Sequence, residues 1–145
     1  NGAHFLIDKN GQIYQTASVL ARCYHVGKLI KSKCLTIDRS TCDTGAMARM
    51  LAMTWVSQIN AIDAHERAKP YPDRYPVNGD SIGIELVGMH IDDRNYEAVT
   101  AAQNTSLQWL IDVLYAQFNL KPEDVYRHPT VSYKNPGEAS SAIWK

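Results

Sequence analysis

Two residues near the C-terminal end of the chain, His128 and Glu138, have the chemistry of metal ligands. Imidazole nitrogen and carboxylate oxygen are common zinc donors. His128 also follows a short apolar run, and ligands on α/β sheets usually bind at strand ends. Each residue has an ordinary interpretation as well, because a lone histidine is commonly solvated and a carboxylate in a first helical turn complements that helix N-terminus. The pair alone does not decide between a metal site and a plain surface.

A third candidate, Glu85, lies inside the apolar run Ser-Ile-Gly-Ile-Glu-Leu-Val-Gly. It is either exposed on an alternating strand face or placed on a sheet surface beneath a cleft. In the second case partial desolvation would raise its pKa and suit it to general-base catalysis. By itself Lys134 is a solvated loop lysine. The other histidines have structural or surface interpretations: His4, His25, His65 and His90.

The composition describes one soluble globular domain of 145 residues, with 45% hydrophobic and 21% charged residues. Lys and Arg total 15, and so do Asp and Glu, which leaves no basic field to bind nucleic acid. No apolar run approaches the roughly 20 residues that a membrane span needs. We therefore expect neither a nucleic-acid partner nor a membrane span.

Three cysteines, Cys23, Cys34 and Cys42, do not have the Cys-x-x-Cys spacing of a zinc knuckle or a thioredoxin-type site. Two interpretations stay open. The thiols are buried and idle, or Cys34 and Cys42 form a disulfide, which would require an oxidising compartment.

The elements that must position these residues alternate between strand and helix patterns. Residues 4–17 predict a hairpin around an Asn-Gly turn, 45–66 one amphipathic helix, and 81–89 a buried strand. Thr100 begins a capping box before a helix that extends to Phe118. A short strand at 125–127 and a last helix at 138–144 complete the pattern. The fold class is α/β: a single domain with a central mixed sheet flanked by helices.

Taken together, five segments resemble the zinc-dependent N-acetylmuramoyl-L-alanine amidase family, which also contains the peptidoglycan recognition proteins. They occur in the family's order, and only residues 31–75 are unplaced. The segments are GAHFLIDKNGQIYQ, YHVGK, NGDSIGIELVG, YEAVTAAQ and the final histidine-containing loop followed by Lys, Pro and Gly.

The resemblance implies a peptidoglycan amidase that cuts the bond between N-acetylmuramic acid and the L-alanine of the stem peptide. In this family zinc is held by two His and one Asp or Cys, and a water occupies its open position. Zn²⁺ is therefore the expected cofactor, and peptidoglycan or a muropeptide is the expected partner.

Position by position, the resemblance assigns His128 as the second zinc histidine and His25 as a cleft histidine that contacts substrate. Glu85 matches the strand glutamate that is the catalytic base in one branch of the family. That branch lacks the tyrosine before the hairpin His-Phe, and this chain has Ala3 there. Lys134 resembles the loop lysine that stabilises the oxyanion.

The chain departs from the family pattern at two ligands. The family's first zinc histidine lies on a strand before the hairpin, so we expect residues 1–145 to form a single amidase-like domain that lacks this first strand. The third ligand comes as Asp-Pro-Gly or Cys-Pro, whereas Asn135 stands here. Asn is a poor zinc ligand, and Glu138 is assigned instead. The alternative is a non-catalytic peptidoglycan-binding module with a degenerate metal site.

The resemblance further predicts action on the cell wall, in the periplasm or after secretion, and an antibacterial effector of a secretion system fits a compact chain. Residues 31–75 could carry substrate specificity or contacts to a protein inhibitor (an immunity protein).

Overall fold

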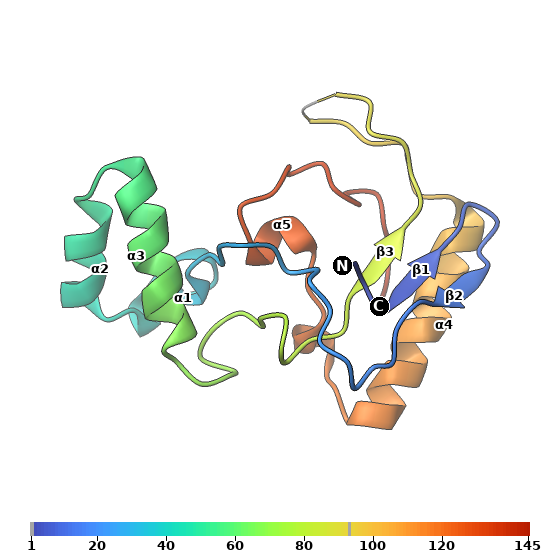
Figure 1. Cartoon of the computed structure of the whole chain (residues 1–145), viewed down its shortest axis with the longest axis horizontal. Coiled ribbons are helices and arrows are strands. Elements are labelled where there is room, and N and C mark those ends of the chain that lie inside the picture. Colours follow the sequence, from blue (N-terminus) through green and yellow to red (C-terminus); the bar gives the residue numbers. More distant parts are fainter. Residues whose placement is uncertain (1, 93) are drawn as a thin grey trace.

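The computed structural model describes residues 2–92 and 94–145 (Figure 1). In these residues three strands form one mixed sheet in the order β2-β1-β3: β1 (Phe5–Ile7), β2 (Ile13–Gln15) and β3 (Ile84–Leu86). β1 pairs antiparallel with β2 and parallel with β3. The expected hairpin is confirmed, and the α/β fold class with it.

The hairpin turn is held by the Asp8 carboxylate, whose Oδ1 accepts the backbone N–H groups of Asn10 and Gln12, both at 2.9 Å. The backbone then pairs Asp8 with Gln12 again, at 3.0 Å. In this Asx geometry a short polar side chain caps its own turn. The hairpin could therefore be predicted from the local sequence alone.

Helix α4 (Ala101–Phe118) packs on one face of the sheet (Figure 1). Its capping box is formed as predicted, with Thr100 and Gln103 exchanging side-chain and backbone hydrogen bonds. The Gln103 amide also donates to the carbonyls of Ile7 and Val87, at 3.2 and 2.9 Å. A buried cluster joins helix and sheet: Phe5, Ile7, Leu107, Leu110, Ile111, Leu114 and Ala142.

Four helical segments form a lobe to one side of the sheet, coloured cyan to green in Figure 1: α1 (Lys33–Thr36), η1 (Arg39–Thr41), α2 (Thr44–Leu51) and α3 (Trp55–Arg67). We call residues 31–75 the insert lobe. The single helix predicted over 45–66 is wrong, because α2 ends at Leu51 and α3 starts after Thr54. Folding back as a hairpin lets Met47 and Met50 face Ile62, and it leaves Trp55 63% exposed.

The last part of the chain contains η2 (Pro122–Asp124) and α5 (His128–Val131). The strand predicted at 125–127 is absent, since no described strand pairs with these residues. The helix predicted at 138–144 is also wrong. Ala139 has a left-handed φ of 47°, which interrupts helical geometry, and 138–141 form turns. No helix in the described part of the chain has the length and apolarity to cross a membrane.

Cys34 and Cys42 form a disulfide, which decides between the two interpretations of this pair. The bond joins α1 to the residue that follows η1. Cys23 is a free, half-buried thiol. The disulfide therefore fastens the small apolar cluster of the insert lobe, in which Cys34 is buried.

Replacing both Cys34 and Cys42 by serine should lower the free energy of unfolding by about 2 kcal/mol, because the bond restricts the unfolded chain. Denaturant unfolding without reductant measures this. Cys23→Ser removes only the free thiol and should stay within about 0.5 kcal/mol of the parent. A double variant as stable as the parent would contradict the role assigned to the bond.

Candidate active site

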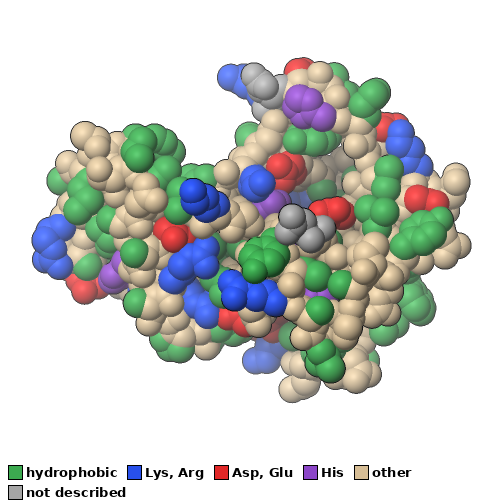
Figure 2. Space-filling view, viewed as in Figure 1, with side chains coloured by type: hydrophobic (Ala, Val, Ile, Leu, Met, Phe, Trp, Pro, Cys, Tyr) green, Lys and Arg blue, Asp and Glu red, His purple; other side chains and the backbone are tan. Residues whose placement is uncertain are grey.

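One cavity of about 930 Å³ collects all five residues singled out from the sequence. Figure 2 shows a hollow beneath the loop that precedes α4. The residues come from different parts of the chain and line the same space: His25, Glu85, His128, Lys134 and Glu138. The structure therefore brings the predicted site together, and the chemistry of each side chain follows from its contacts.

His128 makes two contacts through its ring. Nε2 lies 2.9 Å from the carbonyl oxygen of Val26, and Nδ1 lies 3.0 Å from a carboxylate oxygen of Glu138. Because a carbonyl only accepts, Nε2 must carry a proton and donate it. Metal-binding histidines commonly donate their second ring nitrogen to a carbonyl in this way, so Nδ1 is the nitrogen left for a metal or for the carboxylate.

The donors of the cavity can be compared with what a zinc ion requires. Zinc takes at least three protein ligands, and within 2–92 and 94–145 no three His, Cys, Asp or Glu side chains gather to hold a metal. His4 does not add a donor, because its Nδ1 accepts the Gly83 N–H at 3.0 Å and its Nε2 donates to the Ala21 carbonyl at 2.9 Å. His128 and Glu138 alone therefore fall short of the donor set that a zinc ion requires.

Asn135, the residue at the family's usual third-ligand position, uses its side chain locally. Its Oδ1 accepts the backbone N–H of Gly137 at 2.9 Å, and this contact closes the turn before Glu138. Glu138 instead points its carboxylate at His128. The geometry favours Glu138 over Asn135 as the donor beside His128.

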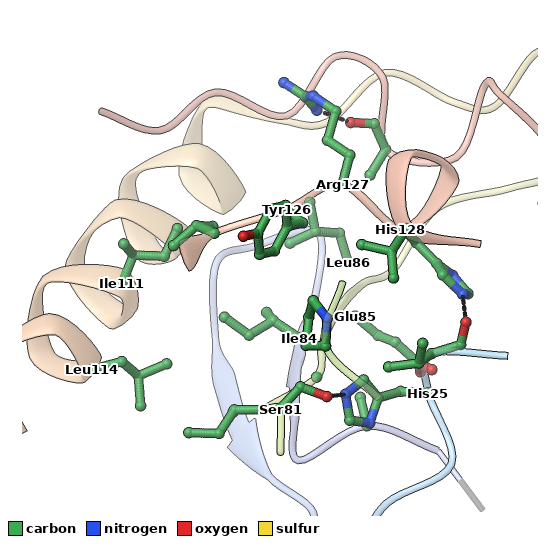
Figure 3. Close-up of a pocket in the computed structure, with 18 of the residues that line it drawn as sticks. His25, Ser81, Ile84, Glu85, Leu86, Ile111, Leu114, Tyr126, Arg127 and His128 are labelled. Atoms are coloured by element: carbon green, nitrogen blue, oxygen red, sulfur yellow. Dashed lines mark hydrogen bonds between the residues drawn. The ribbon is translucent and has the colours of Figure 1, made fainter. Parts of the chain in front are cut away.

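His25 is fixed by hydrogen bonds at its backbone and ring. Asn78 Oδ1 accepts the N–H groups of His25 and Val26, at 3.1 and 2.8 Å. The ring Nε2 lies 2.9 Å from Ser81 Oγ (Figure 3). Ser81 donates its own proton to the Val77 carbonyl, so it accepts from His25, which places the ring proton on Nε2.

The other ring nitrogen of His25, Nδ1, is buried and has no hydrogen-bond partner in the described structure. Burial lowers the pKa of His25 to about 4, and the nearby His4 ring adds to the effect. The His4 and His25 rings meet edge to face, 5.4 Å apart. His25 is therefore a neutral residue in the cavity wall at physiological pH, with one unshared acceptor.

At two positions of the motifs, Gly83 and Gly27, any other residue would bring a Cβ close to neighbouring side chains. A Cβ on Gly83 would lie 2.5 Å from the His25 ring carbon Cγ. Gly27, at φ +94°, has the Lys134 side chain 3.3 Å and the His128 Nε2 3.6 Å from where its Cβ would be. These glycines explain why Ser-Ile-Gly and His-Val-Gly occur where they do. They also let the cavity wall close around the two histidines.

Glu85 and Lys134 are both exposed, and neither has a salt-bridge partner among the described residues. Glu85 lies between Ile84 and Leu86 on β3 (Figure 3). Both alternatives for Glu85 hold in part: the side chain is exposed, and it lines the cavity. An unpaired carboxylate and an unpaired ammonium group thus border the same space as the His128–Glu138 pair.

The deeper part of the cavity is apolar. Figure 3 shows Ile84 and Leu86 of β3 facing the same space as Ile111 and Leu114 of α4, with Tyr126 above them. Among the described strands, β3 pairs only with β1. An apolar slot therefore lies along the free edge of β3, and we use this name for it below.

A model of the N-acetylmuramoyl-L-alanine amidase family matches residues 1–140. The chain belongs to this family, as its segments suggested. No curated protein and no solved structure matches the chain. The family assignment supports amidase chemistry on peptidoglycan in general.

Gly83→Ala should destabilise the fold by about 1–3 kcal/mol, because the new methyl group would overlap the His25 ring. Gly79→Ala is the matched control, since no atom lies within 4 Å of its Cβ position. Thermal and denaturant unfolding compare the two variants. Equal stability of both would show that His25 does not occupy this position.

His25 should titrate in NMR spectra with a midpoint near pH 4. Because this folded-state pKa lies below the ordinary value of 6.5, the unfolded chain takes up the proton first. The stability that neutral His25 provides is present above pH 6.5 and is lost as the pH falls towards 4. His25→Gln should weaken the pH dependence of unfolding in this window. A midpoint near 6.5 would contradict the burial described.

Proposed function

We propose that this chain hydrolyses the amide bond between N-acetylmuramic acid and the L-alanine of the stem peptide. The observation that carries the proposal is the common cavity of a contacting His128–Glu138 pair, an unpaired Glu85 and an unpaired Lys134. Amide hydrolysis needs a base for water, a positive group for the developing oxyanion and a polarising centre. The cavity offers a residue for each of these roles.

Glu85 accepts the proton of the attacking water in this proposal, and it can return that proton to the leaving amine. Its carboxylate is free to do so because it has no competing ion pair in the described residues. Lys134 places its ammonium group toward the carbonyl oxygen as negative charge develops there. His25, held neutral, forms part of the cavity wall against which the substrate would lie.

We propose zinc as the polarising centre, with His128 Nδ1 and the Glu138 carboxylate as two of its ligands. When bound, zinc supplies a Lewis acid and a water of lowered pKa. Support comes from the proton on His128 Nε2, which the Val26 carbonyl holds in place, leaving Nδ1 directed at Glu138. The carboxylate and the ring nitrogen already lie 3.0 Å apart.

The apolar slot supports a proposal for the third ligand. A further β-strand that pairs with the free edge of β3 would cover Ile84 and Leu86. Such a strand would bring a histidine to the same end of the sheet as His128.

The proposed site of action is the cell wall, in the periplasm or outside the cell. The Cys34–Cys42 disulfide supports this, because disulfides persist in oxidising compartments. The same proposal includes a role as a bacterial effector and an inhibitor protein that binds the insert lobe.

The test uses the full-length protein and a purified muropeptide, with release of the stem peptide followed by chromatography and mass spectrometry. Glu85→Gln should reduce kcat by about 10²–10⁴-fold. Glu123→Gln is the matched control, because Glu123 is exposed and does not line the cavity. Zinc content should be near one per chain in the parent and should fall in Glu138→Ala. A parent that neither cleaves the muropeptide nor retains zinc would refute the proposal.

A second candidate function is a peptidoglycan-binding module without catalysis. The observation that favours it is the incomplete donor set in residues 2–92 and 94–145. This module would bind muropeptide with the same affinity in the presence and absence of a chelator, and Glu85→Gln would leave that affinity unchanged. Calorimetry on the parent and the variant separates the two functions.

A further inference from the structure

Eight charged side chains line the cavity, and most have partners. Asp80 pairs with Arg74 at 2.6 Å, and Glu97 with Lys9 at 2.5 Å. Three more of these charged side chains have partners. Asp124 accepts from Tyr71, Arg127 donates to the carbonyls of Ala139 and Ala142, and Glu138 contacts His128. These charged groups are all engaged in ion pairs or hydrogen bonds within the protein.

Three cavity charges have no such partner in the described structure: Glu85, Lys134 and Arg22. The proposed reaction uses Glu85 and Lys134. It gives no task to Arg22, whose side chain makes no hydrogen bond to any other described residue. An arginine fork that faces a cavity without a carboxylate partner is suited to bind one from a ligand.

Arg22 is held at the cavity by both its neighbours and its own packing. The Ala21 carbonyl accepts the buried His4 ring, and the His25 N–H is bound by Asn78. The guanidinium lies over the Tyr24 ring, 5.5 Å from its centroid. Cation–π contact keeps the charge and the donors of arginine while limiting its freedom. The guanidinium of Arg22 is therefore preorganised to bind a ligand that enters the cavity.

We propose that Arg22, seated on Tyr24, binds a free carboxylate of the stem peptide and so makes the enzyme prefer acidic over amidated stems. This inference rests on the proposed function and deepens it, because it names the part of the substrate that is selected. A stem peptide carries carboxylates on the glutamate at its second position and, in some walls, on a diamino acid at its third. Both have the same chemistry, and either one could pair with the guanidinium of Arg22.

Two pairs of muramyl tripeptides test the proposal on the zinc-loaded full-length protein. In the first pair the second residue is D-glutamate or its α-amide; in the second the side-chain carboxylate of diaminopimelate is free or amidated. The acid form of one pair should be cleaved with a kcat/KM about fivefold above its amide, the size of a good exposed ion pair. The pair that responds identifies the carboxylate.

Arg22→Gln should bring that ratio close to one. Arg49→Gln removes the same charge from α2, outside the cavity lining, and should leave the ratio as in the parent. The unaltered protein gives an independent reading: the ratio should fall as salt rises to about 1 M, where the Debye length is about 3 Å. Equal rates for acid and amide in both pairs, or a preference that survives Arg22→Gln, would overturn the inference.

Calorimetry with the same tripeptides separates this inference from the proposed function. If the parent cleaves them without a preference that depends on Arg22, only the role of Arg22 fails. If the parent binds but does not cleave them, the ratio of Kd values replaces that of kcat/KM, and the amidase proposal alone fails. If it neither binds nor cleaves any of them, both fail.

Discussion

The site depends on one buried imidazole that has a hydrogen bond at each ring nitrogen. His4 is fully buried; its ring accepts from the Gly83 N–H and donates to the Ala21 carbonyl, and its own N–H donates to the Gly83 carbonyl. Three segments far apart in the sequence are thereby fixed to one ring. β3, with Glu85, is held beside β1, and the segment before His25 is held above the sheet. A buried, fully satisfied polar group of this kind is costly to disturb.

The insert lobe reinforces the opposite side of the same cavity. Asp63 accepts the Ile30 N–H at 2.8 Å, and Arg67 donates to the Lys28 carbonyl at 3.1 Å. Trp55 touches the Tyr133 ring edge to face, next to Lys134. The lobe thus supports the backbone on either side of His128, although none of its own acids or histidines lines the cavity.

Local signals explain what the sequence predicted well. The Asn-Gly turn and the Thr100–Gln103 box are satisfied within a few residues, so they are readable without the rest of the fold. The failures have non-local causes. The helix over 45–66 breaks because Met47 and Met50 bury against Ile62, and no periodicity reveals a fold-back. That the candidate residues share one cavity could be expected only from the resemblance of the segments to the family, in the family's order. The unpaired Arg22 and the low pKa of His25 depend on neighbours that spacing does not specify.

The two ends of the insert lobe are fastened independently of its interior. Ile30 forms an isolated bridge with Ser132, and Asn78 clamps the backbone of His25 and Val26. Chain length in the parts of the lobe that do not carry Trp55, Asp63 or Arg67 can therefore change with little movement of the histidines. A lineage could lengthen or shorten those parts while the cavity stays the same. The lobe and the cavity would then evolve at separate rates within one small domain.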